Sequence, residues 1–375
     1  MGKNGKEVPA VRDKPACMAY LSLPKRTLLG TQNGKVYHMI ALSSPKMVIT
    51  GAAGFLGGRA AKHFAAQFPE YTVLATSRRS SRADELTAAG CIFQAGDLTD
   101  AQFCEQLTQH AEIVVHCAAL SAPFGAYETF RQSNIVATET LLKASLQNGA
   151  KRFIFISTPS IYFDYTDRLD IQESDPLPPK MVNSYAETKR KAEELVLAMN
   201  GQGMETIALR PRAIIGAEDT VIFPRVLEAY HKGRLKIIGD GENICDLTCV
   251  RNVIEAIHCC IRAAADACGE AYNITDGQPV KFWEALKYAL VKLDLQPPTR
   301  KIPKGVALWA GRLLENIAKT FHPHKEPSLT RYGVGILFVN LTLNISKAQK
   351  RLRYQPVMTT FEGIDEYVAW HKKQA

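Results

Sequence analysis

A glycine-rich turn constrains this chain more than any other feature of its sequence. The motif Gly51-x-x-Gly54-x-x-Gly57 follows a short apolar run at 47–50 and precedes an alanine-rich stretch that reaches about Phe68. The pattern predicts a β-strand, a tight turn at Gly51 and a helix that packs closely on the strand through Gly57. Gly54 would let the backbone approach a pyrophosphate, and free N–H groups at the helix N-terminus would bind it. The motif therefore predicts a dinucleotide site.

Apolar runs alternate with helix-compatible segments after the motif. The runs lie at 71–75, 91–94, 113–117 and 153–156, and the helical segments at about 82–89, 99–109 and 126–148. This alternation predicts βαβ units and a parallel sheet. After about Arg212 the rhythm changes to helices joined by short strands, which predicts a cap over the carboxyl edge of the sheet, where ligands bind in such folds.

The expected fold class is therefore α/β, a Rossmann-type doubly wound parallel sheet with a smaller mixed α/β C-terminal substrate cap. We expect residues 1–44 to be a basic leader and residues 45–211 to be the NADP-binding domain, with returning strands from about 234–250. Residues 212–375 are expected to form the substrate-binding cap.

The charge is unevenly distributed along the chain. Of the net charge of +9, residues 1–44 contribute +5, from seven Lys/Arg against Glu7 and Asp13. We interpret residues 1–44 as a flexible leader, or as a segment translated from a start codon upstream of a real start near Met47. The alternative is an arm that docks on a membrane or a partner. The body has little excess charge, so we expect no nucleic-acid partner.

Composition excludes several classes of protein. Hydrophobic residues make up 46% and charged residues 22% of the chain, as in ordinary globular proteins. We see no signal segment and no apolar stretch near the roughly 18–20 residues that span a bilayer, so we expect a cytoplasmic protein. The nine cysteines are odd in number and contain no C-x-x-C pair, which favours reduced thiols and no metal site.

The end of the second strand bears on the choice of coenzyme. NAD-binding folds need an acidic residue there for the ribose hydroxyl, but this chain has Thr76-Ser77-Arg78-Arg79. Two guanidinium groups favour the 2′-phosphate of NADP(H), and NAD(H) remains the alternative if the arginines only form a solvated loop. Asp97-Leu98 follows the third strand, where an adenine would be contacted, although Asp97 could instead cap the next helix.

Tyr185 and Lys189 lie four residues apart, on one side of a helix that Asn183 and Ser184 could cap. A nearby ammonium lowers the pKa of a phenol, which would make Tyr185 a general acid or base. The alternative is an amphipathic surface helix. A buried strand 27 residues upstream delivers Thr158 to the same edge of the sheet, which favours a catalytic site.

Together these motifs resemble the extended short-chain dehydrogenase/reductases, from Lys46 to nearly the C-terminus. The segments that carry the resemblance are the glycine motif, Gly96-Asp97-Leu98, His116-Cys117-Ala118-Ala119, Asn134, Ser157-Thr158-x-x-Ile161-Tyr162, the Tyr185/Lys189 pair, Leu209-Arg210-Pro211 and Gly239-Asp240-Gly241. The resemblance implies an NAD(P)-dependent oxidoreductase, and a homodimer formed through the helices at about 126–148 and 184–199.

The resemblance also implies roles for individual residues. Tyr185 would be the proton donor or acceptor and Thr158 its hydroxyl partner, while Lys189 would bind the nicotinamide ribose and tune Tyr185. Asn134 matches an asparagine near the site, with a purely structural role as the alternative. The residues implied to bind the coenzyme are Gly51, Gly54, Phe55, Leu56, Gly57, Ser77, Arg78, Arg79, Asp97, Leu98, Ala118, Ala119, Lys189 and Pro211.

Two departures separate the chain from nucleotide-sugar enzymes of this family. Dehydratases follow the active threonine with Asp-Glu, where this chain has Pro159-Ser160, and epimerases carry arginine where it has Cys245. Two regions, about 209–241 and 327–356, instead resemble the 3β-hydroxysteroid dehydrogenase branch, which includes sterol-4-carboxylate 3-dehydrogenases. Segments 157–160 and 233–241 are most similar to bacterial 2-alkyl-3-oxoalkanoate reductases of olefin biosynthesis.

This resemblance implies NADPH-dependent reduction of the 3-keto group of a hydrophobic 2-alkyl-3-oxo acid. The alternative is an NAD-dependent 3β-hydroxysteroid or sterol-4-carboxylate 3-dehydrogenase, ahead of a nucleotide-sugar epimerase or reductase. Arg212 is the candidate partner of the substrate carboxylate, unless it forms a salt bridge to the sheet, and Ser160 is a second candidate contact. Enzymes of a lipid pathway are candidate partners.

Residues 301–321 interleave large apolar residues with Lys301, Lys304, Arg312 and Lys319. This pattern predicts a basic amphipathic helix. Such a helix suits a substrate delivered from a membrane surface or a partner enzyme, so the protein could be peripheral to a membrane. The alternative is a cap helix that packs its apolar side inward and solvates its charges.

Overall fold

The computed structural model describes residues 31–32, 35–36, 44–322 and 326–374. The chain falls into two units, Met1–Ser43 and Ser44–Ala375. In the first unit, strands β1 (Thr31–Gln32) and β2 (Lys35–Val36) pair in antiparallel fashion. The rest of the expected leader up to residue 43 lies outside the described residues, as does Cys17.

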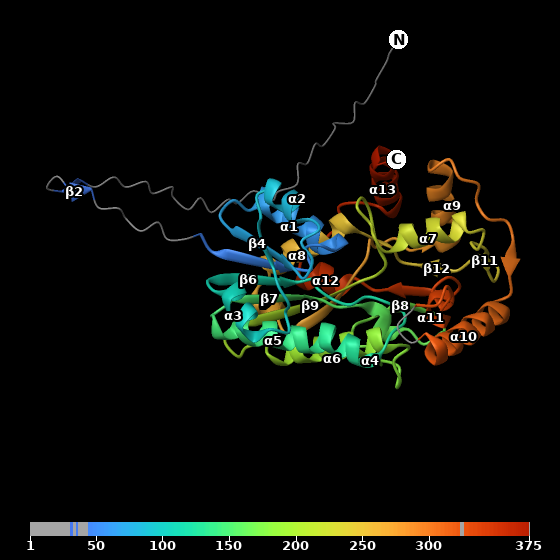
Figure 1. Cartoon of the computed structure of the whole chain (residues 1–375), viewed down its shortest axis with the longest axis horizontal. Coiled ribbons are helices and arrows are strands. Elements are labelled where there is room, and N and C mark those ends of the chain that lie inside the picture. The colour runs from blue at the N-terminus through green and yellow to red at the C-terminus, as the bar shows by residue number, and fades with distance from the viewer. Residues whose placement is uncertain (1–30, 33–34, 37–43, 323–325, 375) are drawn as a thin grey trace, which may run out of the picture. The chain divides into compact units, whose positions relative to one another are not determined.

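A parallel seven-stranded sheet organises the second unit (Figure 1). Its strand order is β14-β9-β7-β6-β3-β4-β5, and each neighbouring pair is parallel. Along the chain this is the doubly wound order with the switch between β3 and β6, which confirms the predicted Rossmann-type fold. The strands are β3 (Lys46–Thr50), β4 (Thr72–Ser77), β5 (Ile92–Ala95), β6 (Ala111–His116), β7 (Arg152–Ile156), β9 (Glu205–Pro211) and β14 (Glu270–Ile274).

The strand that returns to this sheet differs from the predicted one. β14 pairs with β9 in a register that sets Ile274 opposite Pro211. The strands within 234–250 are two residues long each and belong to small separate sheets. The prediction of returning strands at about 234–250 was wrong because pairing over such a distance leaves no local signal in the sequence.

Helices cover both faces of the sheet, and successive strand residues alternate between the two sides. Met47 and Ile49 pack in one core with α1 and α8, while Val48 packs in the other with α3, α5 and α6. Figure 1 shows these two layers above and below the strands. The helices are α1 (Phe55–Gln67), α2 (Ala83–Ala88), α3 (Ala101–Thr108), α4 (Tyr127–Phe130), α5 (Ala137–Gln147), α6 (Ser184–Ala198), α8 (Val250–Ile261) and α12 (Ser346–Arg351).

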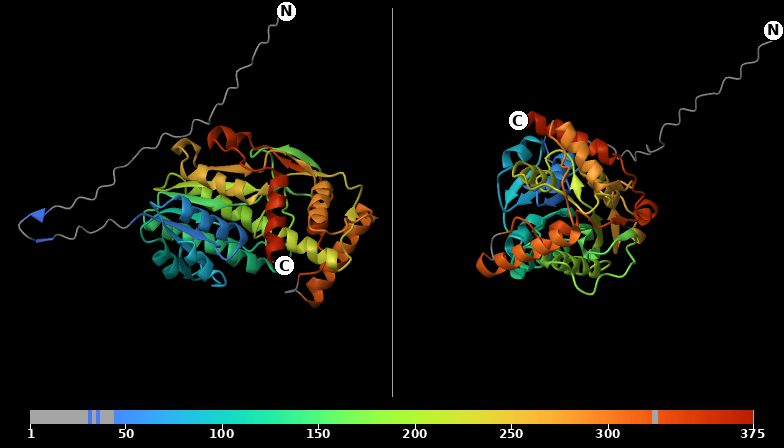
Figure 2. Two further views of the ribbon diagram at one scale, coloured as in Figure 1. Left: turned by 90° about the horizontal axis from the view of Figure 1, so that it is seen from above. Right: turned by 90° about the vertical axis from the view of Figure 1, so that its right-hand side faces the viewer.

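The cap joins helices to short strands around a core of its own. Figures 1 and 2 show its helices gathered at one end of the seven-stranded sheet. Its elements are β8 (Arg168–Ile171), β10 (Ile214–Ile215), α7 (Ile222–His231), β11 (Ile237–Ile238), β12 (Ile244–Cys245), β13 (Thr248–Cys249), β15 (Val280–Lys281), α9 (Phe282–Lys292), β16 (Lys301–Ile302), α10 (Lys304–Phe321), α11 (Arg331–Gly335), β17 (Leu341–Leu343) and α13 (Thr360–Gln374). Across the described ranges, no helix is both long and apolar enough to cross a membrane.

Candidate active site

The glycine turn has the tight geometry that its sequence predicts. Gly51 has a φ of +70°, and a Cβ at this position would lie 2.8 Å from the backbone nitrogen of Ala118. A Cβ at Gly57 would lie 2.4 Å from the carbonyl oxygen of Gly51, so only glycine lets α1 approach β3 this closely. The N-terminus of α1 has neither a side-chain cap nor an acidic residue in its first turn. Its free N–H groups therefore suit coenzyme phosphates.

A buried histidine holds the next strand end against this turn. Thr50 and His116 are partners in the sheet, and Thr50 Oγ1 lies 2.7 Å from His116 Nδ1. Thr50 Oγ1 also accepts a hydrogen bond of 3.1 Å from the N–H of Ala118. This contact places the loop with Ala118 and Ala119 beside the glycine motif.

The other ring nitrogen of His116 lies 2.9 Å from Thr138 Oγ1. Since Thr138 donates its own proton to the carbonyl of Asn134, Thr138 accepts from His116 Nε2. Burial lowers the pKa of His116 to about 3. His116 is therefore a neutral structural group, and it entered the sequence analysis only as part of a motif.

The loop after β4 exposes the two predicted arginines. Arg78 and Arg79 are both exposed, and Ser77 Oγ donates to the carbonyl of Arg79. Arg82, which sequence reasoning missed, pairs with Glu218 and donates a hydrogen bond of 3.3 Å to the carbonyl of Gly54. Arg82 thus connects the glycine turn to this loop, while the side chains of Arg78 and Arg79 stay in solvent.

Asp97 does not cap the following helix. Its Oδ1 accepts hydrogen bonds of 2.9 Å from both the N–H and the hydroxyl of Thr99. These bonds lower the pKa of Asp97, the backbone N–H of Thr99 contributing most. Asp100 is the N-cap of α3 and accepts from the N–H of Gln102 and of Phe103. The capping alternative for Asp97 was wrong, and the carboxylate stays beside buried Leu98 at the end of β5.

Thr158 lies where β7 ends and caps a short 3-10 turn, Pro159–Tyr162. Its hydroxyl accepts from the N–H of Ser160 at 3.2 Å and donates to the hydroxyl of Ser160 at 3.0 Å. Ser160 Oγ in turn lies 2.8 Å from the hydroxyl of Tyr332 on α11. The predicted residues Thr158 and Ser160 therefore contact each other, and a tyrosine of the cap, which sequence reasoning missed, joins them.

Tyr185 reaches this group of hydroxyls from the first turn of α6. Asn183 caps the helix as predicted, its Oδ1 accepting from the N–H of Ala186 at 2.9 Å. Burial raises the pKa of Tyr185, while the hydroxyl groups of Thr158 and Ser121 oppose this increase. The structure thus brings Tyr185 and Thr158 together and holds the phenol protonated at neutral pH.

Lys189 lies beneath this site with only 1% of its surface exposed. Its Nζ donates a hydrogen bond of 2.6 Å to the carbonyl of Ile156 and lies 3.8 Å from the ring centroid of Phe155. Burial lowers the pKa of Lys189 to about 7. We predicted that Lys189 lowers the pKa of Tyr185, but the pKa of the phenol is raised, because burial outweighs any effect of a lysine that bonds to the strand.

Asn134 connects the loop after β6 to α6. It lies on a π-helical turn, Arg131–Val136, a feature often found at functional sites. Its Oδ1 accepts from the N–H of Leu120 at 2.7 Å, and its Nδ2 donates to Thr188 Oγ1 at 3.1 Å. These contacts favour a positioning role, because Thr188 directly precedes Lys189.

Arg212 follows the last residue of β9, Pro211, and is 8% exposed. Its Nε is buried and finds no hydrogen-bond partner in the part of the chain that the structure describes. Among the described residues Arg212 forms no ion pair to the sheet, so that alternative is not supported; its neighbour Arg210 in β9 instead pairs with Glu193 on α6. A buried guanidinium nitrogen without a partner is unfavourable unless a ligand satisfies it.

Asp246 is the acidic group that Arg212 influences. Burial raises the pKa of Asp246 to about 7, and Arg212 opposes this increase. Asp246 Oδ2 accepts a hydrogen bond of 2.6 Å from the N–H of Leu343. Since Asp246 is only partly ionised near neutral pH, it leaves the charge of Arg212 incompletely balanced.

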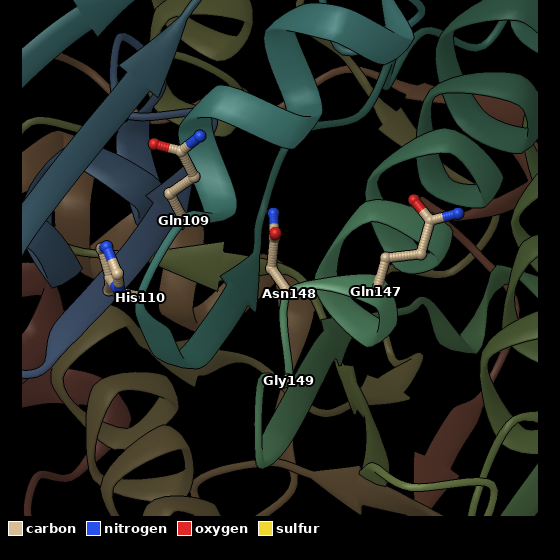
Figure 3. Close-up of a pocket in the computed structure, with 5 residues that line it drawn as sticks. All are labelled: Gln109, His110, Gln147, Asn148 and Gly149. Carbon is tan, nitrogen blue, oxygen red and sulfur yellow. The ribbon is translucent and has the colours of Figure 1, made fainter.

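A hollow elsewhere on the molecule does not belong to this site. It is lined by Gln109, His110, Gln147, Asn148 and Gly149 (Figure 3). These residues lie beside the amino ends of β6 and β7, opposite to the edge that carries Thr158. None of the predicted site residues lines it.

Comparisons with known proteins identify the family and the relatives of this chain. The model of the NAD dependent epimerase/dehydratase family matches residues 47–275. A 3beta-hydroxysteroid-dehydrogenase/decarboxylase isoform 1 of Arabidopsis thaliana is 38% identical over 268 residues, which cover 68% of this chain and 61% of that protein. This chain therefore spans only part of that relative. A 2-alkyl-3-oxoalkanoate reductase of Stenotrophomonas maltophilia is 30% identical over 324 residues, or 85% of this chain and 97% of that protein.

The fold also has solved counterparts. A UDP-glucuronic acid 4-epimerase from Bacillus cereus, solved in complex with NAD, superposes with a TM-score of 0.68. The two proteins are 20% identical, and the match covers 88% of this chain and 99% of that one. At this identity the similarity concerns the fold.

The low pKa of Lys189 makes stability depend on pH. The unfolded chain holds this proton with the ordinary lysine pKa of 10.5, whereas the folded chain releases it near 7. Between these values the unfolded state binds more protons, so the free energy of unfolding rises with pH, by at most about 1.4 kcal/mol per pH unit. We expect Lys189→Met to lose this contribution in coenzyme-free protein, as measured by urea denaturation at several pH values. Lys232→Met, at the exposed end of α7, should keep the wild-type slope, and an unchanged slope in Lys189→Met would contradict the assignment.

Proposed function

The chain belongs to the NAD-dependent epimerase/dehydratase family and is an NAD(P)-dependent oxidoreductase, and on this premise we propose that it reduces the 3-keto group of a hydrophobic 2-alkyl-3-oxo acid with NADPH. The observation that supports this substrate most is the buried, incompletely paired Arg212 at the carboxyl edge of the sheet. The rest of the proposal rests on the register of the strands that precede Thr158 and Arg212.

The spacing of the polar groups fits a 3-oxo acid. In the register of β7 and β9, Ile156 lies opposite Leu209, so Thr158 and Arg212 follow neighbouring strand ends. Adjacent strands are about 4.8 Å apart. The carboxylate of such an acid is two bonds from its keto carbon, a separation of the same order as the distance between neighbouring strands.

The coenzyme supplies the hydride, and residues of this chain position it and move the proton. The uncapped N-terminus of α1 would bind the phosphates, and Lys189 would bind the nicotinamide ribose. Tyr185, protonated at neutral pH, would donate its proton to the keto oxygen, while the hydroxyl of Thr158 turns from Ser160 to hold that oxygen. Lys189, with its pKa of about 7, can then return a proton to Tyr185.

One chemical feature argues against a nucleotide-sugar substrate. Burial raises the pKa of Cys245 to about 11, so this residue is a neutral thiol at the place where epimerases carry an arginine. A neutral thiol binds a diphosphate poorly compared with a guanidinium. The second candidate is instead an NAD-dependent 3β-hydroxysteroid or sterol-carboxylate dehydrogenase, which the 38% identity to the plant relative favours.

The helices α5 and α6 pack side by side and carry exposed charged residues, among them Lys143 on α5 and Glu194 on α6. We propose that they form the surface of a homodimer, as the resemblance to extended short-chain dehydrogenase/reductases implies. Tyr185, Thr158 and Lys189 all come from one chain, so the proposed reaction does not need the dimer.

Replacing the phenol tests the reaction directly. We expect Tyr185→Phe to lower kcat/KM for reduction of a 2-alkyl-3-oxo acid by about 10²–10⁴-fold, because general acid catalysis contributes that much. NADPH binding, followed by fluorescence, should stay the same. Tyr288→Phe, whose phenol bonds to Asp365 in the cap, is the matched control and should keep full activity. Turnover of a 3β-hydroxysteroid with NAD⁺ but not of the keto acid would favour the second candidate.

Arg212→Met tests the proposed carboxylate partner. We expect KM for the keto acid to rise about 10- to 100-fold, because a charged hydrogen bond is lost. A ketone of the same shape without the carboxylate should be reduced equally by both proteins. Arg225→Met, at an exposed position on α7, serves as the control. Equal losses on both substrates would mean that Arg212 supports the fold rather than the substrate.

The two exposed arginines determine the coenzyme in this proposal. We expect the double variant Arg78→Ala/Arg79→Ala to bind NADPH about tenfold or more weakly, since two contacts to a phosphate are removed. Its affinity for NADH should change little, and isothermal titration with both coenzymes would show the difference. A wild-type protein that binds NADH more tightly than NADPH would contradict the preference.

A further inference from the structure

Helix α10 exposes an apolar stripe along one side. Val306, Trp309, Leu313, Ile317 and Phe321 have exposed fractions of 56%, 66%, 43%, 43% and 70%. They are three or four residues apart, so their side chains follow one side of the helix over its whole length. Large apolar residues exposed singly need no explanation, but a continuous row marks an interaction surface.

The side that packs on the cap is a different one. Ala307, Gly311 and Ala318 are the buried residues of α10, and α10 packs on α11. A Cβ at Gly311 would lie 3.1 Å from the backbone nitrogen of Arg331, so the two helices are in close contact. The alternative interpretation of this helix is confirmed in part, because α10 packs on the cap through Ala307 and Leu308, but the row from Val306 to Phe321 does not pack inward.

Positive side chains of α10 lie beside the apolar stripe. Arg312 and Lys319 are exposed next to it, whereas Lys304 at the start of the helix lies on another side, with its ammonium 5.3 Å from the ring centroid of Phe338. The acidic residue of the helix, Glu315, accepts a hydrogen bond of 2.8 Å from the N–H of Arg331. An exposed apolar row with cationic neighbours is the arrangement of helices that lie in the interface of an anionic membrane. Trp309 in the stripe is of the residue type enriched at that depth.

We propose that α10 docks this protein on an anionic membrane surface, with the stripe from Val306 to Phe321 immersed among the lipids and the basic side chains at the head groups. Figures 1 and 2 show α10 at the outer edge of the cap, away from the seven-stranded sheet, so the sheet does not block this contact. A second copy is disfavoured as the occupant, because two-fold pairing of identical helices would bring their cationic side chains together.

This docking places the lipid surface next to the candidate site. The neighbouring helix α11 carries Tyr332, whose hydroxyl lies 2.8 Å from Ser160 Oγ beside Thr158. One helix thus separates the proposed membrane contact from the catalytic hydroxyls, a short path for a hydrophobic substrate. The docking itself rests on α10 alone and does not require the proposed substrate to be right.

Vesicle binding by the full chain tests the proposal. We expect co-sedimentation with phosphatidylcholine vesicles that contain phosphatidylglycerol and weaker binding to phosphatidylcholine alone. Trp309→Ser/Phe321→Ser should bind the anionic vesicles at least about tenfold more weakly, because two large apolar side chains no longer enter the lipid. Leu169→Ser/Val357→Ser, at positions 59% and 61% exposed elsewhere, is the matched control and should bind like the wild type. All variants should melt like the wild type, since the changed side chains are exposed.

A second measurement distinguishes α10 from other contacts of the chain. Lipids brominated on their acyl chains should quench the fluorescence of Trp309, and Trp309→Phe should lose that quenching. Arg312→Gln/Lys319→Gln should weaken binding to the anionic vesicles about tenfold and leave the weaker binding to phosphatidylcholine unchanged. Equal binding by the stripe variant and its control, or no quenching, would overturn the proposal. If the wild type forms dimers in the absence of vesicles and Trp309→Ser/Phe321→Ser does not, the stripe would instead be a contact with a second copy of this chain.

Discussion

The close approach of α1 to β3 is the constraint on which the rest of this structure depends. Because Gly57 has no side chain, the helix packs with its backbone against the carbonyl of Gly51, and its N-terminus opens at the edge where the strands end. The loop with Ala118 reaches the same turn through Thr50 and His116. The glycine turn and the loop with Ala118, which are both proposed to contact the coenzyme, are therefore held together at this point.

The two residues at the centre of the site are both buried in a way that favours their neutral forms. Burial raises the pKa of Tyr185 and lowers that of Lys189 to about 7. An anionic coenzyme beside Lys189 would raise the pKa of the amine again. Coenzyme binding and protonation of Lys189 are therefore linked. The charge of the bound coenzyme, together with Lys189, would set the pKa of the Tyr185 phenol.

Local patterns in the sequence were enough to predict the five strands β3, β4, β5, β6 and β7, the glycine turn and the cap of α6 at Asn183, because each is determined by residues a few positions apart. The position of β14 was missed, since it depends on pairing with β9 about sixty residues earlier. For the same reason the contacts of Arg82 with Glu218 and of Tyr332 with Ser160 left no sequence signal. The contacts of Asp97 and the exposed row of α10 could not be predicted, because sequence spacing does not show which neighbour a side chain meets.

The return of β14 to the sheet after α7 and α8 has a consequence for the architecture. The chain leaves the sheet after β9, builds part of the cap, and comes back before it completes the cap. A truncation at the predicted boundary near 211 would leave β9 as an unprotected edge strand, prone to pair with other chains. The nucleotide-binding half and the cap are therefore topologically interleaved, and neither can be transplanted onto another scaffold as a contiguous stretch of sequence.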